Sequence, residues 1–305
     1  MQRYLIFRFA QSLLALLGVS IIVFGLTRLS GDVVEFYLPQ DAHPEDFVRV
    51  REAWGLDKPI VVQYGVYVGN IMKGDWGRSF RYNDDALGLV VEKFPKTLKL
   101  AGFTIAISTI LGLGIGVFVS IRKGSIFDTG GKILALLGQS VPSFWLGLML
   151  MWIFAVHLGW LPTSGEGGIK HMIMPAIALG GFNVAALMRL TRSAMLDVLD
   201  SEYIKLARIK GLSERKIIWK HALRNAAIAP LTYFGVVTGF LLTGSVVTET
   251  VFAWPGIGLL AVEAVEARDY AVVQGVVIFM ASMFIFANLV VDVLYAYLDP
   301  RIRYN

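Results

Sequence analysis

The sequence predicts an all-α polytopic membrane protein with six transmembrane helices and a small helical subdomain outside the membrane. Of its 305 residues, 56% are hydrophobic and only 17% are charged, and the mean hydropathy is +0.63. A water-soluble domain needs more charge than this to cover its surface. Six long segments carry no Asp, Glu, Lys or Arg, and outside the long segment that follows the first of them the basic residues gather on one side. These observations together predict the fold class.

The charge-free segments define the predicted spans. A spanning helix needs about 20 mostly apolar residues, because backbone groups in hydrocarbon must form their hydrogen bonds within the helix. The segments cover residues 9–27, 100–121, 133–156, 172–188, 225–248 and 271–291. The fourth is the shortest, and Pro175 and Gly180-Gly181 predict that it is the least regular. Pro142 in the third predicts either a break that turns carbonyls toward a cavity or a tolerated kink.

The distribution of Lys and Arg predicts the orientation. Sixteen lie at the two ends of the chain and in alternate loops, whereas the two short loops of the opposite side hold only Lys170 and Arg268. Both termini are therefore predicted to be cytoplasmic. The N-terminus resembles a secretory signal, but its apolar run is long and no A-x-A site follows, which predicts an uncleaved anchor.

Residues 30–96 are predicted to form an external helical segment between residues 1–29, which hold the first span, and a core membrane domain of residues 97–305. Pro44 is typical of a helix start and Gly55 of a helix end, and Pro59 and Gly74 delimit a second helix in the same way. Two interpretations are open for this segment. It forms a cap over the outer mouth of the bundle, or it is a docking surface for a partner.

Several chemistries are excluded by the sequence. The net charge is +5, but the basic residues form no stripe, so nucleic acid is not a predicted partner. There is no cysteine, no G-x-x-x-x-G-K-[ST] and no H-E-x-x-H, and the four histidines are scattered. Gly256, Gly258 and Ala261 satisfy G-x-G-x-x-A, but no strand precedes them. We expect no catalytic residue, no cofactor and no metal on this chain.

The segment of residues 197–226 has a helix–glycine–helix pattern. Asp200-Ser201 can cap a first helix, Gly211 breaks it, and Ser213 with Glu214 can begin a second. In that second helix Ile217, Ile218 and Ala222 are predicted to face the membrane domain, and Arg215, Lys216 and Lys220 to face outward. From these residues alone, the segment is either a lever that contacts another protein or a basic loop that serves only topology.

A family resemblance favours the first interpretation. "YIKLARIKGLSERKIIWKHALRNA" resembles the cytoplasmic coupling loop, or EAA loop, of ABC importer permeases. "GLDKPIVVQY", "GDWGRSF", "PSFWLG", "GWLPTSG", "GSVVTETVFAWPGIGLLAVEAVEARDYAVVQG" and "NLVVDVLYAYLDPRIRY" resemble the dipeptide, oligopeptide, nickel and glutathione permeases, nearly from end to end. The similarity is greatest to the subunit with the large first external loop. Leu206 and Ile209 depart from the family pattern, which often has Thr and Ala there.

The resemblance implies a type I ABC importer permease fold, a peptide-class solute and a bacterial or archaeal inner membrane as the location. It also implies four kinds of partner: a second homologous permease, two ATPase subunits that hold ATP and Mg, an external substrate-binding protein and the lipid bilayer. Carried over by position, the ATPase-coupling residues are Glu202, Tyr203, Ala207, Lys210, Gly211, Leu212, Ser213, Glu214, Arg215, His221, Ala222 and Leu223. Small residues allow close packing there, and Gly211 permits the chain to reverse.

Further residues within the spans have predicted roles. Pro142, Ser143, Phe144 and Glu249 are candidates for the pathway or its outer gate. Asp292 interrupts the last span, where an unpaired charge is costly, so we expect an ion pair with Arg189 or Arg192. Gly112, Gly114 and Gly116 fit close helix packing, either within this subunit or against the partner permease.

Two rival functions fit the sequence less well. An intramembrane enzyme needs paired ionisable groups at one depth inside the spans, and only Asp292 and span-edge charges are available. A secondary transporter is expected to show internal repeats and to work without nucleotide, and no clear repeat is present.

Overall fold

The computed structural model describes residues 2–31, 34, 38, 43–230, 232–233, 241 and 245–298, without the side chains of residues 2–5 and 291–298. In this described part every regular element is a helix, apart from one isolated bridge between Arg78 and Asp85. The chain divides into two compact units. Unit 1 comprises Met1–Thr97 and Pro255–Asn305, and unit 2 comprises Leu98–Trp254. The long helix α5, Ala86–Ser120, belongs to both.

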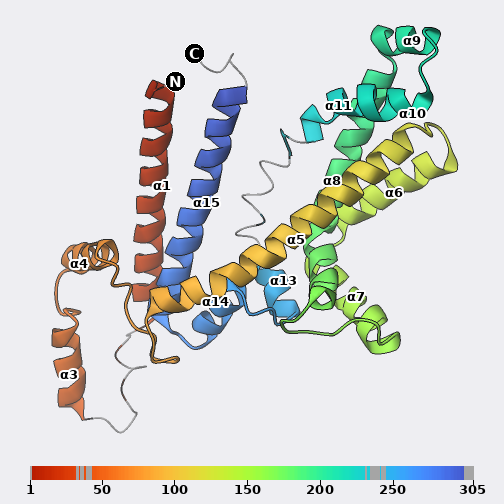
Figure 1. The fold of residues 1–305 in the computed structure, drawn as a ribbon. Helices are drawn as coiled ribbons and strands as arrows, with labels where there is room; N and C mark the ends of the chain where they lie inside the picture. Colours follow the sequence, from red (N-terminus) through yellow and green to blue (C-terminus); the bar gives the residue numbers. More distant parts are fainter. Residues whose placement is uncertain are drawn as a thin grey trace. The chain divides into compact units, whose positions relative to one another are not determined.

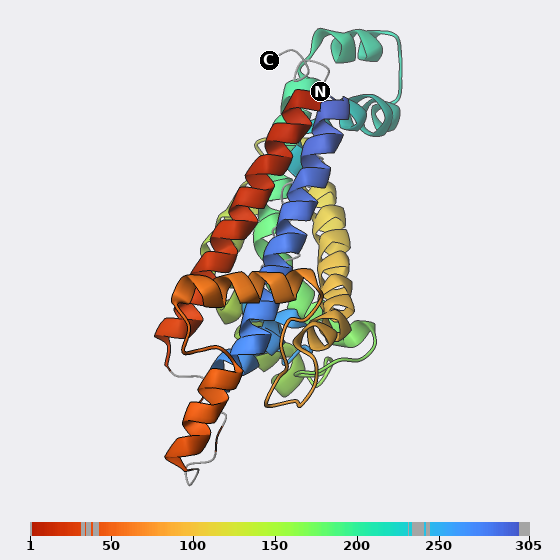
Figure 2. The same ribbon diagram turned by 90° about the vertical axis from the view of Figure 1, so that its left-hand side faces the viewer.

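Unit 1 is built on the pair α1, Gln2–Leu29, and α15, Tyr270–Leu298, which run side by side (Figures 1 and 2). The Gln274 amide donates a hydrogen bond to Thr27 Oγ1 and joins the two helices. Helix α14, Ile257–Glu266, packs on α15, and its apolar face joins the first turns of α5 in a buried core. The unit therefore has a core of its own.

The two helices predicted for residues 30–96 form where the sequence places them. Helix α3 spans Pro44–Ala53 and helix α4 spans Ile60–Met72, and the turns that follow them contain Gly55 and Gly74 with positive φ of 66° and 86°. Only glycine adopts such angles without steric cost. The rings of Tyr64 and Tyr67 in α4 lie 5.4 and 5.3 Å from the ring of Phe24 in α1. Helix α4 is thus packed on the first spanning helix.

Unit 2 contains the close packing of α5 with α8, Ile169–Leu199. A Cβ atom added at Gly112 would lie 2.6 Å from Leu187 Cβ, and one added at Gly116 would lie 2.6 Å from Thr191 Cβ. Nothing lies within 4 Å of the corresponding position at Gly114. At Gly112 and Gly116 the close packing therefore occurs within the subunit.

The third predicted span is not one straight helix but two arms that meet at Pro142. Helix α6, Ile126–Ser140, ends before Pro142, and α7, Ser143–Leu150, continues as the π-helix η1, Met151–His157, with a bend of 108° between the two arms. Val141 has extended backbone angles, because the proline ring disfavours a helical conformation at the preceding residue. Of the two interpretations of Pro142, the structure shows the break.

The fourth predicted span lies within one continuous helix, α8, although Pro175 lies inside it. The prediction that this segment is the least regular was wrong. Four described helices are long and apolar enough to cross a membrane, and a fifth span results if the bent pair α6–α7 is counted as one. Most of the predicted span 225–248 lies outside the described residues, which include α11, Leu223–Ala226, before it and α13, Val246–Val251, at its end.

Candidate functional site

The coupling segment, residues 197–226, follows the end of α8 and has the predicted helix–glycine–helix structure. Helix α9 spans Glu202–Ile209, and Gly211 then adopts a φ of +77°. The Leu212 N–H donates to the Ala207 carbonyl and closes the end of α9. Helix α10, Glu214–Lys216, begins after Ser213 and continues into η2, Ile217–Ala222, and α11. The glycine permits the chain to reverse at this point because it has no Cβ.

One face of the coupling segment is packed into unit 2. Ile204 of α9 and Ile217 and Ala222 of η2 are fully buried with Met195 of α8 and Val117 of α5. Partly buried Ala207, Leu212 and Leu223 pack around them. A π-helix joins residues five apart by hydrogen bonds, so Ile217 and Ala222 face the same side. The segment is therefore fixed to the end of α8 by an apolar core.

Polar contacts hold the two arms of the reversal together. Arg208 Nε donates to Glu214 Oε1 at 2.8 Å across the Gly211 turn. The Asn225 side chain donates to the Tyr203 hydroxyl at 2.8 Å and joins α11 to α9. These contacts connect both ends of the segment as well as its middle, so the reversal is internally braced.

Other polar groups of the segment differ in their exposure. The hydrogen bond from Lys205 to Glu202 raises the pKa of Lys205 above its usual value. Lys210 and Arg215 are exposed. His221 Nε2 is buried and has no hydrogen-bond partner in the part of the chain that the structure describes.

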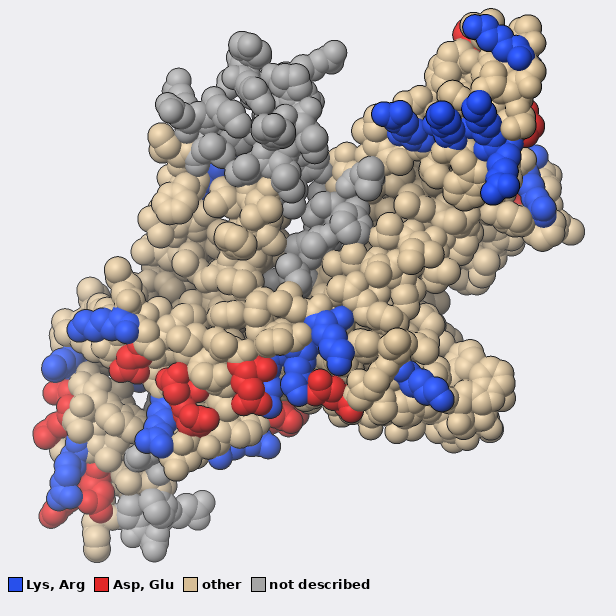
Figure 3. All heavy atoms as spheres, in the orientation of Figure 1, with Lys and Arg blue, Asp and Glu red and all other residues tan. Residues whose placement is uncertain are grey.

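The outward face of the segment combines exposed apolar side chains with basic ones. Tyr203, Leu206, Ile209 and Trp219 are 45%, 51%, 82% and 57% exposed. Exposed Lys and Arg side chains belong to the same segment, and Figure 3 shows basic side chains over α9, α10 and α11. The basic members are Lys205, Arg208, Lys210, Arg215, Lys216, Lys220 and Arg224. Such a surface fits a partner with apolar pockets and acidic groups.

A buried ion-pair cluster near this segment was missed by sequence reasoning. The Asp128 side chain at the start of α6 is 1% exposed. Its carboxylate accepts from Arg192 Nε at 2.7 Å, from Arg192 Nη2 at 3.0 Å and from the Gly124 N–H at 3.0 Å, and Lys132 Nζ lies 3.1 Å away. The cluster joins α6 to α8. A Ser-x-x-Asp pattern, Ser125 to Asp128, is a helix-start signal that could have drawn attention to this carboxylate.

Arg192 therefore has Asp128 as its ion-pair partner, whereas the sequence made Arg192 one of two candidates, with Arg189, for pairing with Asp292. The side chain of Asp292 lies outside the described residues, so its own pairing stays a prediction, as does the alternative with Arg189. The sequence does not reveal the Asp128–Arg192 pair, because the two residues lie 64 positions apart.

The candidate pathway residues lie at two places in unit 2. Pro142 and Ser143 form the break before α7, and Phe144 in the first turn of α7 is 49% exposed. Glu249 in α13 is fully buried, and its Oε1 accepts from the Ser245 hydroxyl. Helix α13 packs against α7, and Phe252 contacts Gly147. In this structure Glu249 supports α13 from within, so an outer-gate role for it requires a change of conformation.

Within the described residues, no group of three or more His, Cys, Asp or Glu side chains is placed to hold a metal ion.

The fold and the bent coupling segment define the class of membrane-embedded permease subunits of ABC transporters. Residues 112–304 match the family described as "Binding-protein-dependent transport system inner membrane component", and residues 1–101 match the model of its N-terminal part. The chain belongs to this family.

Similar proteins agree with this family. The chain is 38% identical over 318 residues to the dipeptide transport system permease protein DppB of Alkalihalophilus pseudofirmus, covering 95% of this chain and 96% of the relative. It is 39% identical over 306 residues to the glutathione transport system permease protein GsiC of Salmonella choleraesuis, over the full length of both. Among solved structures, an inward-facing MetNI methionine ABC transporter chain matches with a TM-score of 0.50 and 18% identity, covering 67% of this chain and 95% of that one. That likeness supports the fold.

Proposed function

We propose that this chain is one of two permease subunits of an ABC importer for peptides or similar small solutes, and that partner ATPases drive it through the coupling segment. The outward face of that segment carries the proposal. It presents Ile209, which is 82% exposed, and Trp219 beside a ring of basic side chains, while the inward face is fixed to α8. A segment serving only topology does not need an apolar outward face.

The energy source is assigned to other chains. The sequence has no G-x-x-x-x-G-K-[ST], so ATP and Mg would be held by the two ATPase subunits. Closure of the ATPases would move residues 202–225 as a rigid element, and the spans would rock around a cavity shared with the second permease. Transport is then a shift between inward-open and outward-open populations, driven from the cytoplasmic side.

The substrate class and orientation are part of the same proposal. Relatives named for dipeptide and glutathione transport favour a peptide-like solute, delivered by an external binding protein. The basic loops favour an orientation with both termini and the coupling segment in the cytoplasm and with α3 and α4 outside. Uptake of labelled dipeptide and of labelled glutathione into proteoliposomes, with each candidate binding protein added outside, identifies the substrate.

Cross-linking tests the coupling assignment directly. The chain has no cysteine, so a cysteine introduced at Ile209 is its only thiol. In the assembled transporter, a short bifunctional cross-linker on Cys at 209 is expected to capture an ATPase subunit. The matched control is a cysteine at Val48 in α3, which is 53% exposed and is expected to capture none. Equal capture from both positions, or none from position 209, would contradict the proposal.

The pathway residues need a separate experiment. Glu249→Gln keeps the size of a buried side chain and removes its charge, and the Ser245 hydroxyl can still donate to the amide oxygen. If Glu249 takes part in the outer gate, the variant changes both uptake and substrate-stimulated ATP hydrolysis. Unchanged uptake and hydrolysis would remove Glu249 from the gate and leave only Pro142, Ser143 and Phe144 as candidates.

A further inference from the structure

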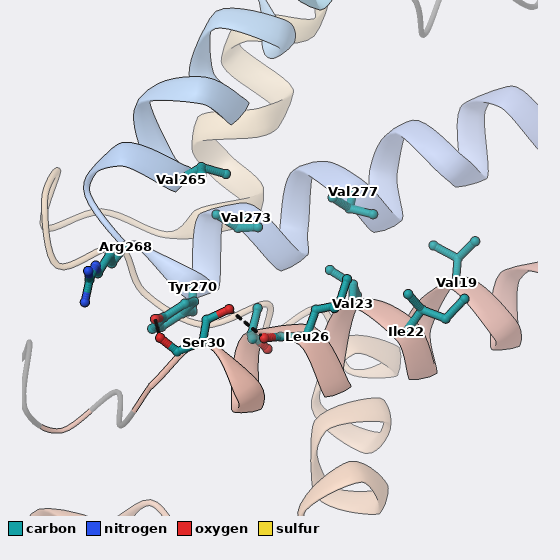
Figure 4. Close-up of a pocket in the computed structure, with 11 residues that line it drawn as sticks. Val19, Ile22, Val23, Leu26, Ser30, Val265, Arg268, Tyr270, Val273 and Val277 are labelled. Atoms are coloured by element: carbon teal, nitrogen blue, oxygen red, sulfur yellow. Dashed lines mark hydrogen bonds between the residues drawn. The ribbon is translucent and has the colours of Figure 1, made fainter.

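A groove in unit 1 has the polarity pattern of a site for an amphiphile. It lies between α1, α14 and α15 and has a volume of about 640 Å³, within the usual range for bound small molecules (Figure 4). Most of its length is lined by Val19, Ile22, Val23 and Leu26 of α1 and by Val273 and Val277 of α15. These side chains carry no polar atom, so this part of the groove suits a hydrocarbon chain.

The polar groups of the groove gather at one end. Ser30 and Tyr270 lie together there, where α1 ends and α15 begins, and Arg268 lines the same end with its side chain directed outward (Figure 4). The Tyr270 hydroxyl donates to the Ser30 carbonyl at 3.3 Å, and the Ser30 hydroxyl donates to the Leu26 carbonyl at 2.7 Å. Arg268 is exposed and has a φ of +57°, which is uncommon for a residue with a side chain. This angle ends α14, where the Arg268 N–H donates to the Val265 carbonyl and the Asp269 N–H to the Ala264 carbonyl.

The length of the groove matches one leaflet of a bilayer. From Val19 to Ser30, α1 rises by about 16 Å at 1.5 Å per residue. Half of a hydrocarbon core of roughly 30 Å is nearly the same length. Tyrosine and arginine at the polar end are residue types that anchor at the membrane–water interface. An acyl chain running from the interface to the bilayer centre would fill the groove.

We propose that this groove binds one phospholipid, with an acyl chain against Val19–Leu26 and the phosphate accepting hydrogen bonds from Arg268. A guanidinium presents paired donors that suit a phosphate group. A transmembrane helix of another subunit is a less suitable occupant, because helix contacts in membranes favour small residues and this lining is Val, Ile and Leu. The bond between Gln274 and Thr27 fixes α1 against α15 and keeps the site formed.

Photolabelling of the assembled transporter tests the proposal. The transporter is placed in nanodiscs of equal parts phosphatidylglycerol and phosphatidylethanolamine, with phosphatidylglycerol that carries a diazirine on its acyl chain. We expect adducts in residues 19–30 and 265–277. Arg268→Gln is expected to lower their yield about tenfold, the value of one charged hydrogen bond of roughly 1.4 kcal/mol. Arg49→Gln in α3 is the control, since Arg49 is 76% exposed and outside the groove, and its adduct yield should not change.

Two further measurements make the result decisive. Arg268→Lys keeps the charge and should retain much of the labelling that Arg268→Gln loses. A benzophenone on a single cysteine at Ile22 should capture lipid. Labelling that is indifferent to Arg268→Gln, or that Arg268→Lys fails to preserve, would overturn the proposal. Capture of another subunit's helix from position 22 would also overturn it.

Discussion

The contact of α5 with α8 gives the sharpest stability prediction, because two glycines of one helix differ only in what they face. A Cβ at Gly116 would lie 2.6 Å from Thr191 Cβ and 2.9 Å from the Met188 carbonyl oxygen. Carbon atoms in contact normally stand about 3.5–4.0 Å apart, so the helices would have to separate by roughly 1 Å. Overpacking of this kind costs about 1–3 kcal/mol, and the upper part of that range applies here because one obstacle is backbone.

The comparison with Gly114 isolates this cost. A Cβ at Gly114 meets nothing within 4 Å, and Ala in place of Gly favours the helix equally at both positions. The difference between Gly116→Ala and Gly114→Ala is therefore the packing cost alone, about 2–3 kcal/mol. We expect SDS titration of the purified permease in micelles to show this difference in free energy of unfolding. Equal stability of the two variants would refute the described α5–α8 packing.

Three further predictions concern single sites. Asp128→Asn removes the charge that holds Arg192 and is expected to lower the melting temperature of the assembled transporter. The decrease should be larger than for Glu202→Gln, which breaks an exposed ion pair. Equal decreases in melting temperature would show that the Asp128 cluster does not stabilise the fold. Gly211→Val places a β-branched residue at a positive φ, which should lower the free energy of unfolding by about 1–2 kcal/mol and reduce the solute taken up per ATP hydrolysed. Gly211→Asn is the control, because asparagine tolerates that angle and the variant should stay near wild type. Equal uptake per ATP in the two variants would contradict this placement of the turn. Phe24→Ala removes the ring that contacts both Tyr64 and Tyr67. Proteolysis in the loop before α4 should become faster while ATP hydrolysis stays unchanged. An unchanged rate of proteolysis would mean that these ring contacts do not hold α4.

Local signals in the sequence were sufficient where one residue decides the backbone. Pro44, Gly55, Pro59 and Gly74 mark the limits of α3 and α4 closely, and Gly211 marks the reversal of the coupling segment. Each of these residues restricts or relaxes its own φ, so the effect does not depend on distant contacts.

Features that depend on tertiary contacts were not predictable in the same way. Hydropathy cannot distinguish a straight span from one broken at Pro142, because both arms are equally apolar. The pairing of Arg192 joins residues 64 positions apart, and a charge count does not specify partners at that separation. The exposed position of Ile209 follows from the packing of Ile204 on the opposite side of a short helix. Propensity alone gives no reason to place an isoleucine outside.

The contacts around α8 have a mechanical consequence. Val117 of α5 is buried with Met195 of α8 and Ile204 of α9, so the coupling segment, α5 and α8 share one core. The Asp128–Arg192 pair then fastens α6 to α8. A force applied to α9 therefore moves these helices together. Beyond the break at Pro142, α7 follows a different axis and touches α8 only through contacts of its own. We expect the rigid part to end at this break, where no continuous helix joins α6 to α7.

Distances between spin labels on paired cysteines distinguish this rigid part from the rest. Suitable label positions are Ile209 on α9, Leu134 on α6 and Trp152 on η1, which are 82%, 65% and 52% exposed. This chain has no native cysteine. Between nucleotide-free and ATP-bound transporter, the 209–134 distance is expected to stay constant while the 134–152 distance changes. A 209–134 distance that changes as much as the 134–152 distance would mean that the Asp128 pair and the Val117 core do not transmit force as a unit. The coupling segment would then have to act on α8 alone.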